Sequence, residues 1–315
     1  MAVVILSGLV ACSDSNPTPQ SVPERTVCLE GAIGLSTRAV IGSGYEKDLP
    51  VGFVRQDESQ STAGSYGAWN VCKAVRQGGK GNRPIVFDES QWYPQDGRGI
   101  RLNGYYPAGD GSAVDTGTGK VVFTLDGTTD VMATGMLTAT AYVPVRTCTF
   151  RHLLTQVRLV CYSDRAEEWG TIATIEAVYI HTRQELDCLA ETPALADISS
   201  GDGIQDISVQ DIQGLPVPGI TAEEELPEPQ GYILLPISPT DGTAEHPLRL
   251  RITTTKDGRG NPVETVSNVS VSVEGGFRTG KSHVVTLFFT GNSRIQTTLV
   301  SVEAWTDREQ GDMPI

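Results

Sequence analysis

Residues 275–282 (GGFRTGKS) have the glycine, lysine and serine spacing of a phosphate-binding P-loop. In a P-loop, backbone amides surround the phosphates and a following helix directs its N-terminus toward them. Here the segment leads into residues 283–289 (HVVTLFF), which are β-branched and aromatic and have low helix propensity. The sequence therefore predicts a glycine-rich turn between two strands, and not a nucleotide site.

The other reactive side chains form no catalytic or metal-binding pattern. The histidines at positions 152, 181, 246 and 283 have no acid or nucleophile partner close in the sequence. The aspartates of the acidic stretch 197–230 lack the spacing of an EF-hand loop, and no histidine lies at zinc-ligand spacing from a cysteine. We therefore expect no catalytic residue, no metal and no cofactor, and a protein that is not an enzyme.

Cys12 is the residue with the most specific expected chemistry. Leu9 stands three positions before it, with Val10 and Ala11 between, and the apolar run 3–6 precedes them. This is the cleavage and lipidation signal of bacterial lipoproteins, so we expect removal of the preceding residues and transfer of a diacylglycerol to the Cys12 thiol. A buried N-terminal strand with a chance cysteine is the alternative. No later apolar run approaches the roughly 20 residues of a membrane-spanning helix, so the lipid would be the only anchor.

Composition limits the class of partner. The 315 residues are enough for two domains, and the formal net charge of −14 argues against nucleic acid, whose binding requires basic side chains. Five cysteines follow Cys12, and their odd number leaves at least one thiol unpaired even in an oxidising compartment. Cys161 lies in an apolar stretch and is expected to be a small buried hydrophobe.

The elements that must position these residues are predicted to be β-strands. Apolar and polar residues alternate in 121–126, 248–254 and 269–274, and 284–289 is apolar on both faces. The stretch 150–161 fits a helix or a strand, and its β-rich flanks favour a strand. Residues 164–169 have the composition of one helical turn. Short strands separated by Gly and Pro predict an all-β protein built from β-sandwiches.

The domain organisation follows from composition shifts along the chain. Residues 1–12 form the signal peptide with Cys12, and 13–38 a spacer with an N-terminal strand. We expect one β-sandwich over 39–145 and a second over 146–315. The Gly/Asp/Thr-rich stretch 108–119 and the acidic stretch 197–230 are predicted to be loops, the second too long for an ordinary hairpin.

Several segments, taken in order, resemble the fimbrillin family, the lipoprotein-derived pilin and adhesin subunits of Bacteroidales. They are the signal at Cys12, 36–39 (STRA), 92–94 (WYP), 104–108 (GYYPA), 149–159 (TFRHLLTQVRL), 231–236 (GYILLP) and 302–305 (VEAW). The resemblance implies two tandem transthyretin-like β-sandwich domains. It also implies export to the outer membrane as a lipoprotein, cleavage after an arginine by a trypsin-like protease, and assembly by addition of a β-strand from the next subunit.

The resemblance assigns roles to residues near both ends of the chain. Cleavage is expected after Arg38, with Arg25 in reserve and Arg55 less favoured; an ordinary loop arginine is the alternative for Arg38. The strand released from the acceptor groove would carry Val27, Leu29, Ala32, Ile33 and Leu35. The donor strand would lie in 299–305 and carry Leu299, Val300, Val302 and Trp305, unless that stretch is a fixed strand of the second domain.

Together these features predict a pilin of a cell-surface fimbria that serves adhesion. Its partners would be other fimbrial subunits, the outer membrane through the lipid, and a host or bacterial surface receptor. The runner-up is a surface lipoprotein that binds glycans and does not polymerise, for which the aromatic clusters at 92–94 and 105–107 would have to be exposed and not core anchors. An exported hydrolase is the third alternative.

Overall fold

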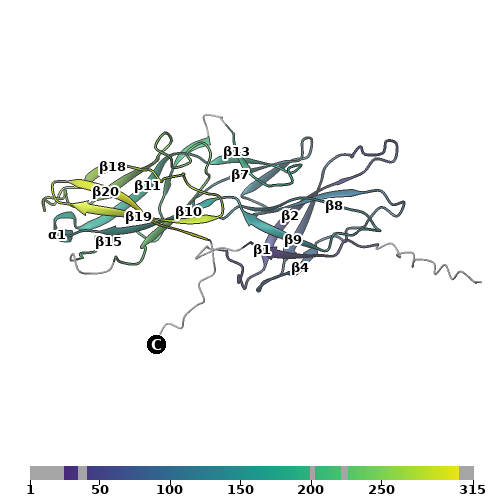
Figure 1. Ribbon diagram of the computed structural model, residues 1–315, viewed down its shortest axis with the longest axis horizontal. Helices are drawn as coiled ribbons and strands as arrows, with labels where there is room; N and C mark the ends of the chain where they lie inside the picture. The colour runs from purple at the N-terminus through teal and green to yellow at the C-terminus, as the bar shows by residue number, and fades with distance from the viewer. Residues whose placement is uncertain (1–24, 35–40, 199–202, 221–225, 305–315) are drawn as a thin grey trace, which may run out of the picture.

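The computed structural model describes residues 25–34, 41–198, 203–220 and 226–304, and the molecule is elongated, with two strand-rich halves end to end (Figure 1). The described part contains 20 strands and one short helix, α1 (Ala166–Trp169). The all-β class predicted from sequence alternation is therefore confirmed. No helix in these ranges is both long and apolar enough to cross a bilayer.

Seven strands close into a barrel in one half of the molecule, drawn purple to teal in Figure 1. In order around the barrel they are β1 (Leu29–Ile33), β4 (Arg83–Phe87), β3 (Asn70–Arg76), β2 (Leu49–Asp57), β5 (Ile100–Tyr106), β8 (Met132–Ala139) and β9 (Thr147–His152). β9 then pairs with β1, and this is the one parallel pair in the ring. Closure leaves this sheet without a free edge, a feature that residue alternation alone does not report.

The other half is a sandwich of two sheets. The first has the order β16 (Gly231–Leu235), β10 (Thr155–Tyr162), β19 (Lys281–Thr290) and β20 (Arg294–Ala304). The second has the order β14 (Ile204–Ser208), β11 (Thr171–His181), β17 (Leu248–Thr254) and β18 (Thr265–Val271), with β15 (Leu215–Pro216) paired to β11. One apolar core lies between them and includes Leu250, Trp169 and Phe289.

A fourth sheet joins strands from distant parts of the chain, in the order β13 (Leu195–Asp197), β12 (Arg183–Asp187), β7 (Lys120–Thr124) and β6 (Ser112–Asp115). β7 and β12 pair from Thr124–Arg183 to Lys120–Asp187. Strand pairing therefore crosses the boundary expected at 145/146, and β9, which lies beyond it, completes the barrel. The two-domain, transthyretin-like description stays a prediction.

Two stretches expected to be loops contain strands. β6 lies within 108–119, and β14 and β15 lie within 197–230. In β14 only Ile207 is buried, so the sequence gives no alternation to detect. The single strand expected over 150–161 is two strands, the end of β9 and most of β10, with a break at residues 153 and 154, and the helical turn expected in 164–169 is confirmed as α1. The P-loop-like segment leads directly into β19, so the helix that phosphate binding needs is replaced by a strand.

Four of the five cysteines that follow Cys12 are packed in the protein interior. Cys72, Cys148, Cys161 and Cys188 are buried, Cys28 is exposed, and none of these five is in a disulfide. Cys161 is fully buried in the sandwich core, as predicted for a small hydrophobe. The lipidation site Cys12 lies outside the described residues. Of the aromatic clusters, Tyr93 and Tyr105 are core anchors, whereas Trp92 is 56% exposed.

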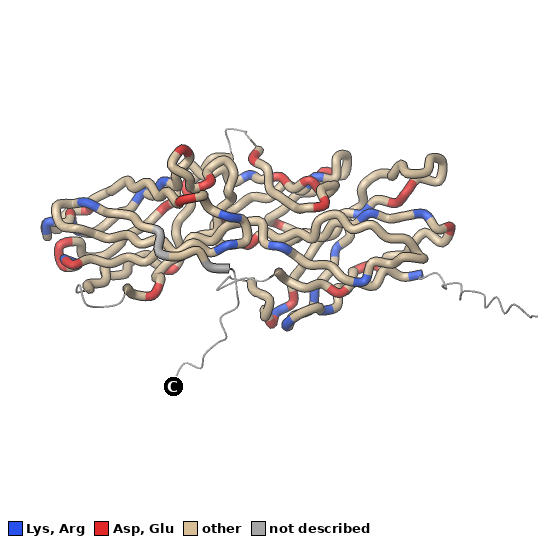
Figure 2. The backbone as a smooth tube through the Cα atoms, in the orientation of Figure 1, with Lys and Arg blue, Asp and Glu red and all other residues tan. Residues whose placement is uncertain are grey.

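Charged residues are spread over both halves of the molecule (Figure 2). Asp206, in the acidic stretch, forms an ion pair of 2.9 Å with Arg251, and Asp197 contacts His181 at 2.8 Å. Within the described ranges, no group of three or more His, Cys, Asp or Glu side chains is placed to hold a metal ion.

Candidate functional site: the β1 seam

The first described segment, residues 25–33, is inserted between segments that come much later in the chain. We call this segment and its contacts with β4, β9 and residues 91–93 the β1 seam. On one side, β1 pairs antiparallel with β4, from Leu29–Ile85 to Gly31–Arg83. On the other side it pairs in parallel with β9 (Figure 1). Every strand that holds β1 is therefore made of residues that follow it.

Backbone hydrogen bonds extend the seam before β1 begins. The Val27 amide donates to the Gln91 carbonyl at 2.8 Å, and the Tyr93 amide donates to the Arg25 carbonyl at 2.9 Å. Main-chain bonds of this kind depend on an extended conformation and not on side-chain identity. These main-chain bonds alone would hold any extended strand, so selectivity for one sequence has to come from the side chains.

The side chains of the seam alternate between the barrel core and solvent. Val27, Leu29 and Ile33 are only 3–4% exposed and join the core, whereas Cys28 and Glu30 are exposed. Burial of each apolar side chain contributes roughly 1.5–3 kcal/mol. The structure thus brings three of the predicted groove residues onto one face. Ala32 is half-buried on the other face, and Leu35 and Arg38 lie outside the described residues.

Gly31 sits between Leu29 and Ile33 on the inward face, and core side chains pack directly on its backbone. A Cβ atom there would lie 2.9 Å from Ile85 Cδ1 and 3.3 Å from Phe150 Cε2. Ile85 is 6% exposed and Phe150 1% exposed, so both lie in the core, where the Ile85 Cδ1 methyl is the flexible end of its side chain and the Phe150 ring is rigid. The seam therefore alternates large, absent and large side chains along its inner face.

Arg76 binds the backbone of the same residue. Its side chain is fully buried, and its Nε donates to the Gly31 carbonyl at 2.9 Å, at the end of the β1–β4 pairing. Its Nη1 donates to the carbonyl of Gln77, and its Nη2 donates to the carbonyls of Gly79 and Gly81. Burial, together with the charge of Arg83, lowers the pKa of Arg76 from its ordinary value. A buried cation is stabilised by the carbonyls that accept its hydrogen bonds, so removal of one carbonyl costs free energy of folding.

A buried acid–imidazole pair lies at the C-terminal end of β1. His152 Nδ1 is 2.5 Å from Asp130 Oδ2, and both side chains are at most 2% exposed. His152 Nε2 is 3.3 Å from the carbonyl of Gly34, whose amide donates to the Phe150 carbonyl. The pair therefore fixes the point at which the chain leaves the seam. Neither Asp130 nor Arg76 could be identified from the sequence, because their partners His152 and Gly31 lie 22 and 45 residues away.

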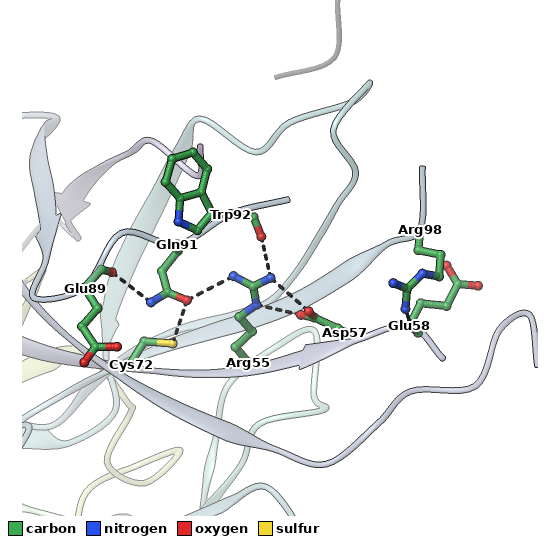
Figure 3. Close-up of polar contacts among 8 residues, drawn as sticks. All are labelled: Arg55, Asp57, Glu58, Cys72, Glu89, Gln91, Trp92 and Arg98. Carbon is green, nitrogen blue, oxygen red and sulfur yellow. Dashed lines mark hydrogen bonds and ion pairs between the residues drawn. The ribbon is translucent and has the colours of Figure 1, made fainter. Parts of the chain in front are cut away.

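Arg55 holds the segment that receives the start of the seam (Figure 3). Its guanidinium donates to the Trp92 carbonyl at 2.7 Å, to Gln91 Oε1 at 3.1 Å and to Asp57 at 2.7 Å. Arg55 is 8% exposed and lies within β2, which disfavours cleavage there. Arg25 is exposed. A cut after Arg25 would leave β1 attached, because Val27 and the rest of the seam follow it.

A cavity of about 670 Å³ opens beside the seam. Its lining comes from both sides of the strand, namely residues 26–30, 84–87, 90, 91, 146 and 147. β1 is thus not fully covered by its neighbours, which leaves one flank of the seam accessible from solvent.

The predicted donor stretch forms the end of β20, an edge strand that pairs with β19. Ser301 pairs with Val284 and Leu299 with Val285, so Val300 is an extra residue at a bulge. A bulge interrupts the ladder of hydrogen bonds. Residues 301–304 therefore form a short terminal part of β20, in which Val302 is 45% exposed. Trp305 lies outside the described residues.

The fold is shared with solved structures from Bacteroides. A candidate cell adhesion protein from Bacteroides uniformis superposes with a TM-score of 0.56 and 14% identity, covering 90% of this chain and 99% of the other. A second from Bacteroides ovatus gives 0.55 and 15%, covering 92% and 100%, and a fimbrial protein from Bacteroides vulgatus gives 0.52 and 14%, covering 90% and 100%.

The family is shown by the sequence itself. No curated protein matches the chain, but the model of the fimbrillin-like family matches residues 37–305, which is most of its length. This assignment confirms the resemblance carried by the segments between 36–39 and 302–305, and it marks the chain as a structural, non-enzymatic protein. The chain belongs to the fimbrillin-like family.

Proposed function

We propose that this chain is a subunit of a cell-surface fimbria that serves adhesion and assembles by β-strand addition after cleavage at Arg38. The observation that carries the proposal is the β1 seam, whose strand precedes Arg38 while β4 and β9 follow it. A cut after Arg38 removes the covalent link between β1 and the strands that it pairs with, so that β1 is held only by non-covalent contacts. When β1 leaves, β4 and β9 each have an unpaired edge, and the sites of three buried apolar side chains are empty. Together they form a surface that binds another strand.

The replacement strand comes from the C-terminal stretch 299–305 of the next subunit. The edge position of β20 supports this assignment, because an edge strand can detach from one neighbour without opening a sheet. The bulge at Val300 supports it further, because residues 301–304 can leave β19 while the longer part of β20 stays paired.

The subunit reaches the cell surface as a lipoprotein. The signal that ends at Cys12 supports export, removal of residues 1–11 and a diacylglycerol anchor in the outer membrane. Other fimbrial subunits are the partners in the fibre, and a host or bacterial surface receptor is the target of adhesion. The fimbrial and candidate adhesion proteins that share the fold support this reading.

Limited digestion of the lipid-free, full-length protein with an arginine-specific protease tests the proposal. We expect a new N-terminus at Ala39, followed by a ladder of oligomers that resists denaturant. The Arg38→Gln variant should give neither product. The Arg25→Gln variant is the matched control and should give both. A protein that is cut after Arg38 but stays monomeric would refute assembly by strand addition and favour the surface lipoprotein that binds glycans.

A further inference from the structure

We propose that Gly31 marks a slot that sets the register of any strand in the place of β1, and that the C-terminal strand of a second copy of this chain fits this slot in a single register. The inference rests on the proposed function for the exchange of strands. Beyond that function, it specifies which residue of the incoming strand lies at each position of β1.

The slot is formed by the two core side chains above Gly31. A Cβ atom at this position meets the terminal methyl of Ile85 at 2.9 Å, which a small shift of that flexible end relieves. A larger side chain would also meet Phe150, whose ring is 3.3 Å from the Cβ position and almost fully buried. Glycine or alanine therefore fits the slot, whereas valine, leucine or a charged residue does not.

Arg76 supplies the second condition. Its guanidinium requires a main-chain carbonyl where that of Gly31 lies, at the end of the pairing with β4. Along an extended strand, successive carbonyls point to opposite sides, so a shift of one residue directs the carbonyl away from Arg76. A shift of two residues restores the carbonyl but moves a neighbouring inward side chain into the slot.

The chain contains a second segment with the pattern of the seam. Residues 27–31 read VCLEG and residues 300–304 read VSVEA. Each pair of positions matches in character: valine with valine, cysteine with serine, leucine with valine, glutamate with glutamate, and glycine with alanine. In this register Ala304 occupies the slot, Val300 and Val302 replace Val27 and Leu29, and Glu303 takes the exposed place of Glu30.

The neighbouring registers fail on the same criteria. With Val302 or Glu303 in the slot, a branched or charged side chain meets Phe150. With Ser301 in the slot, Glu303 takes the buried place of Ile33, which puts an unpaired carboxylate in the core. The register with Ala304 in the slot places Leu299 and Trp305 on the outer face, so only Val300 and Val302 among the four predicted donor residues point inward.

Peptide uptake by the protein cut after Arg38 tests the register. The probes are fluorescent peptides of residues 25–34, of residues 298–307, and of 298–307 carrying Ala304→Val or the matched Ser301→Val. We expect the two unaltered peptides and Ser301→Val to be retained on gel filtration, and Ala304→Val to bind at least about tenfold more weakly. Equal retention of the Ala304→Val and unaltered peptides would overturn the register.

The remaining outcomes separate the register from the proposed function. Uptake of 25–34 without uptake of 298–307 would overturn the donor assignment and leave the exchange of β1 standing. Uptake of no peptide would overturn the exchange and the proposed function with it. The slot has its own test in the uncut protein: Gly31→Val should lower the melting temperature clearly more than Ala32→Val, and equal effects would overturn the slot.

Discussion

The guanidinium of Arg76 donates a 2.9 Å hydrogen bond to the carbonyl of Gly31, across 45 residues of sequence. Arg76 lies on β3, and β4 separates β3 from β1 in the barrel, so the contact ties β1 to a strand that is not its neighbour. If β1 leaves, a buried cation loses an acceptor and three apolar sites lose their side chains. The empty seam is therefore unstable, so binding of another strand in this place is energetically favourable.

Replacement of Arg76 should weaken the whole barrel. Arg76→Met leaves the carbonyls of Gly31, Gln77, Gly79 and Gly81 without their donor. We expect the free energy of unfolding, measured by denaturant titration, to fall by about 2–4 kcal/mol. Lys73→Met is the matched control, because Lys73 lies on the same strand with an exposed side chain. Equal stability of the two variants would show that the guanidinium does not hold β1.

Stability should depend on pH through His283. Burial and the charge of Arg278 lower the pKa of His283 to about 4, and the amide of Arg278 donates to its Nε2. Between the unfolded value near 6.5 and the folded value, only the unfolded chain takes up a proton. This contribution to stability is therefore intact above pH 6.5 and is lost as the pH falls toward 4.

The change that isolates this effect is His283→Asn. The stability advantage of the wild type over this variant should shrink as the pH is lowered from 7 to 4.5, as measured by thermal unfolding. Carboxylates whose pKa is lowered by folding act in both proteins and cancel in the difference. His246→Asn, at an exposed position, should show no such trend. An advantage that stays constant over this range would contradict the assignment.

The sequence was sufficient for the strands that bury one face or both faces. Residues 248–254 alternate and form β17, and 284–289 lie within β19. It was insufficient for β6 and β14, because exposed strands bury too little to impose alternation. The apolar residues of β1 were expected from the resemblance to the fimbrillin family. Arg76 and the Asp130–His152 pair could not be predicted, because strand order in the barrel creates their contacts.

Substitution in the terminal part of β20 should block assembly without unfolding the subunit. Val302 is 45% exposed in the uncut protein, so Val302→Asp should change its melting temperature little. In the place of Leu29, however, the carboxylate would be buried without a partner. We expect the ladder after cleavage to disappear. Thr298→Asp, an exposed position before the bulge, should still form ladders. Ladders from Val302→Asp at the wild-type level would exclude this strand as the donor.

Thiol reactivity should single out Cys28. Cys28 is exposed, whereas Cys72, Cys148, Cys161 and Cys188 are buried. The experiment uses a Cys12→Ser variant at pH 8, which removes the thiol at position 12. Burial raises the pKa of Cys148 and of Cys188 to about 12, so neither forms the reactive thiolate at this pH. A thiol reagent should modify Cys28 rapidly and the other four only in denaturant. Rapid reaction of a second thiol would contradict the burial of the barrel and sandwich cores.

A fluorophore on Cys28 then allows the most direct test of strand replacement, because Cys28 belongs to the segment that cleavage after Arg38 would detach. The labelled protein is cut, allowed to assemble, and separated by gel filtration into monomer and polymer without denaturant. We expect the monomer to keep the label, since β1 stays bound until it is displaced, and the polymer to have lost it in proportion to its length. Polymers that retain one label per subunit would show that assembly does not replace β1 and would contradict assembly by strand addition.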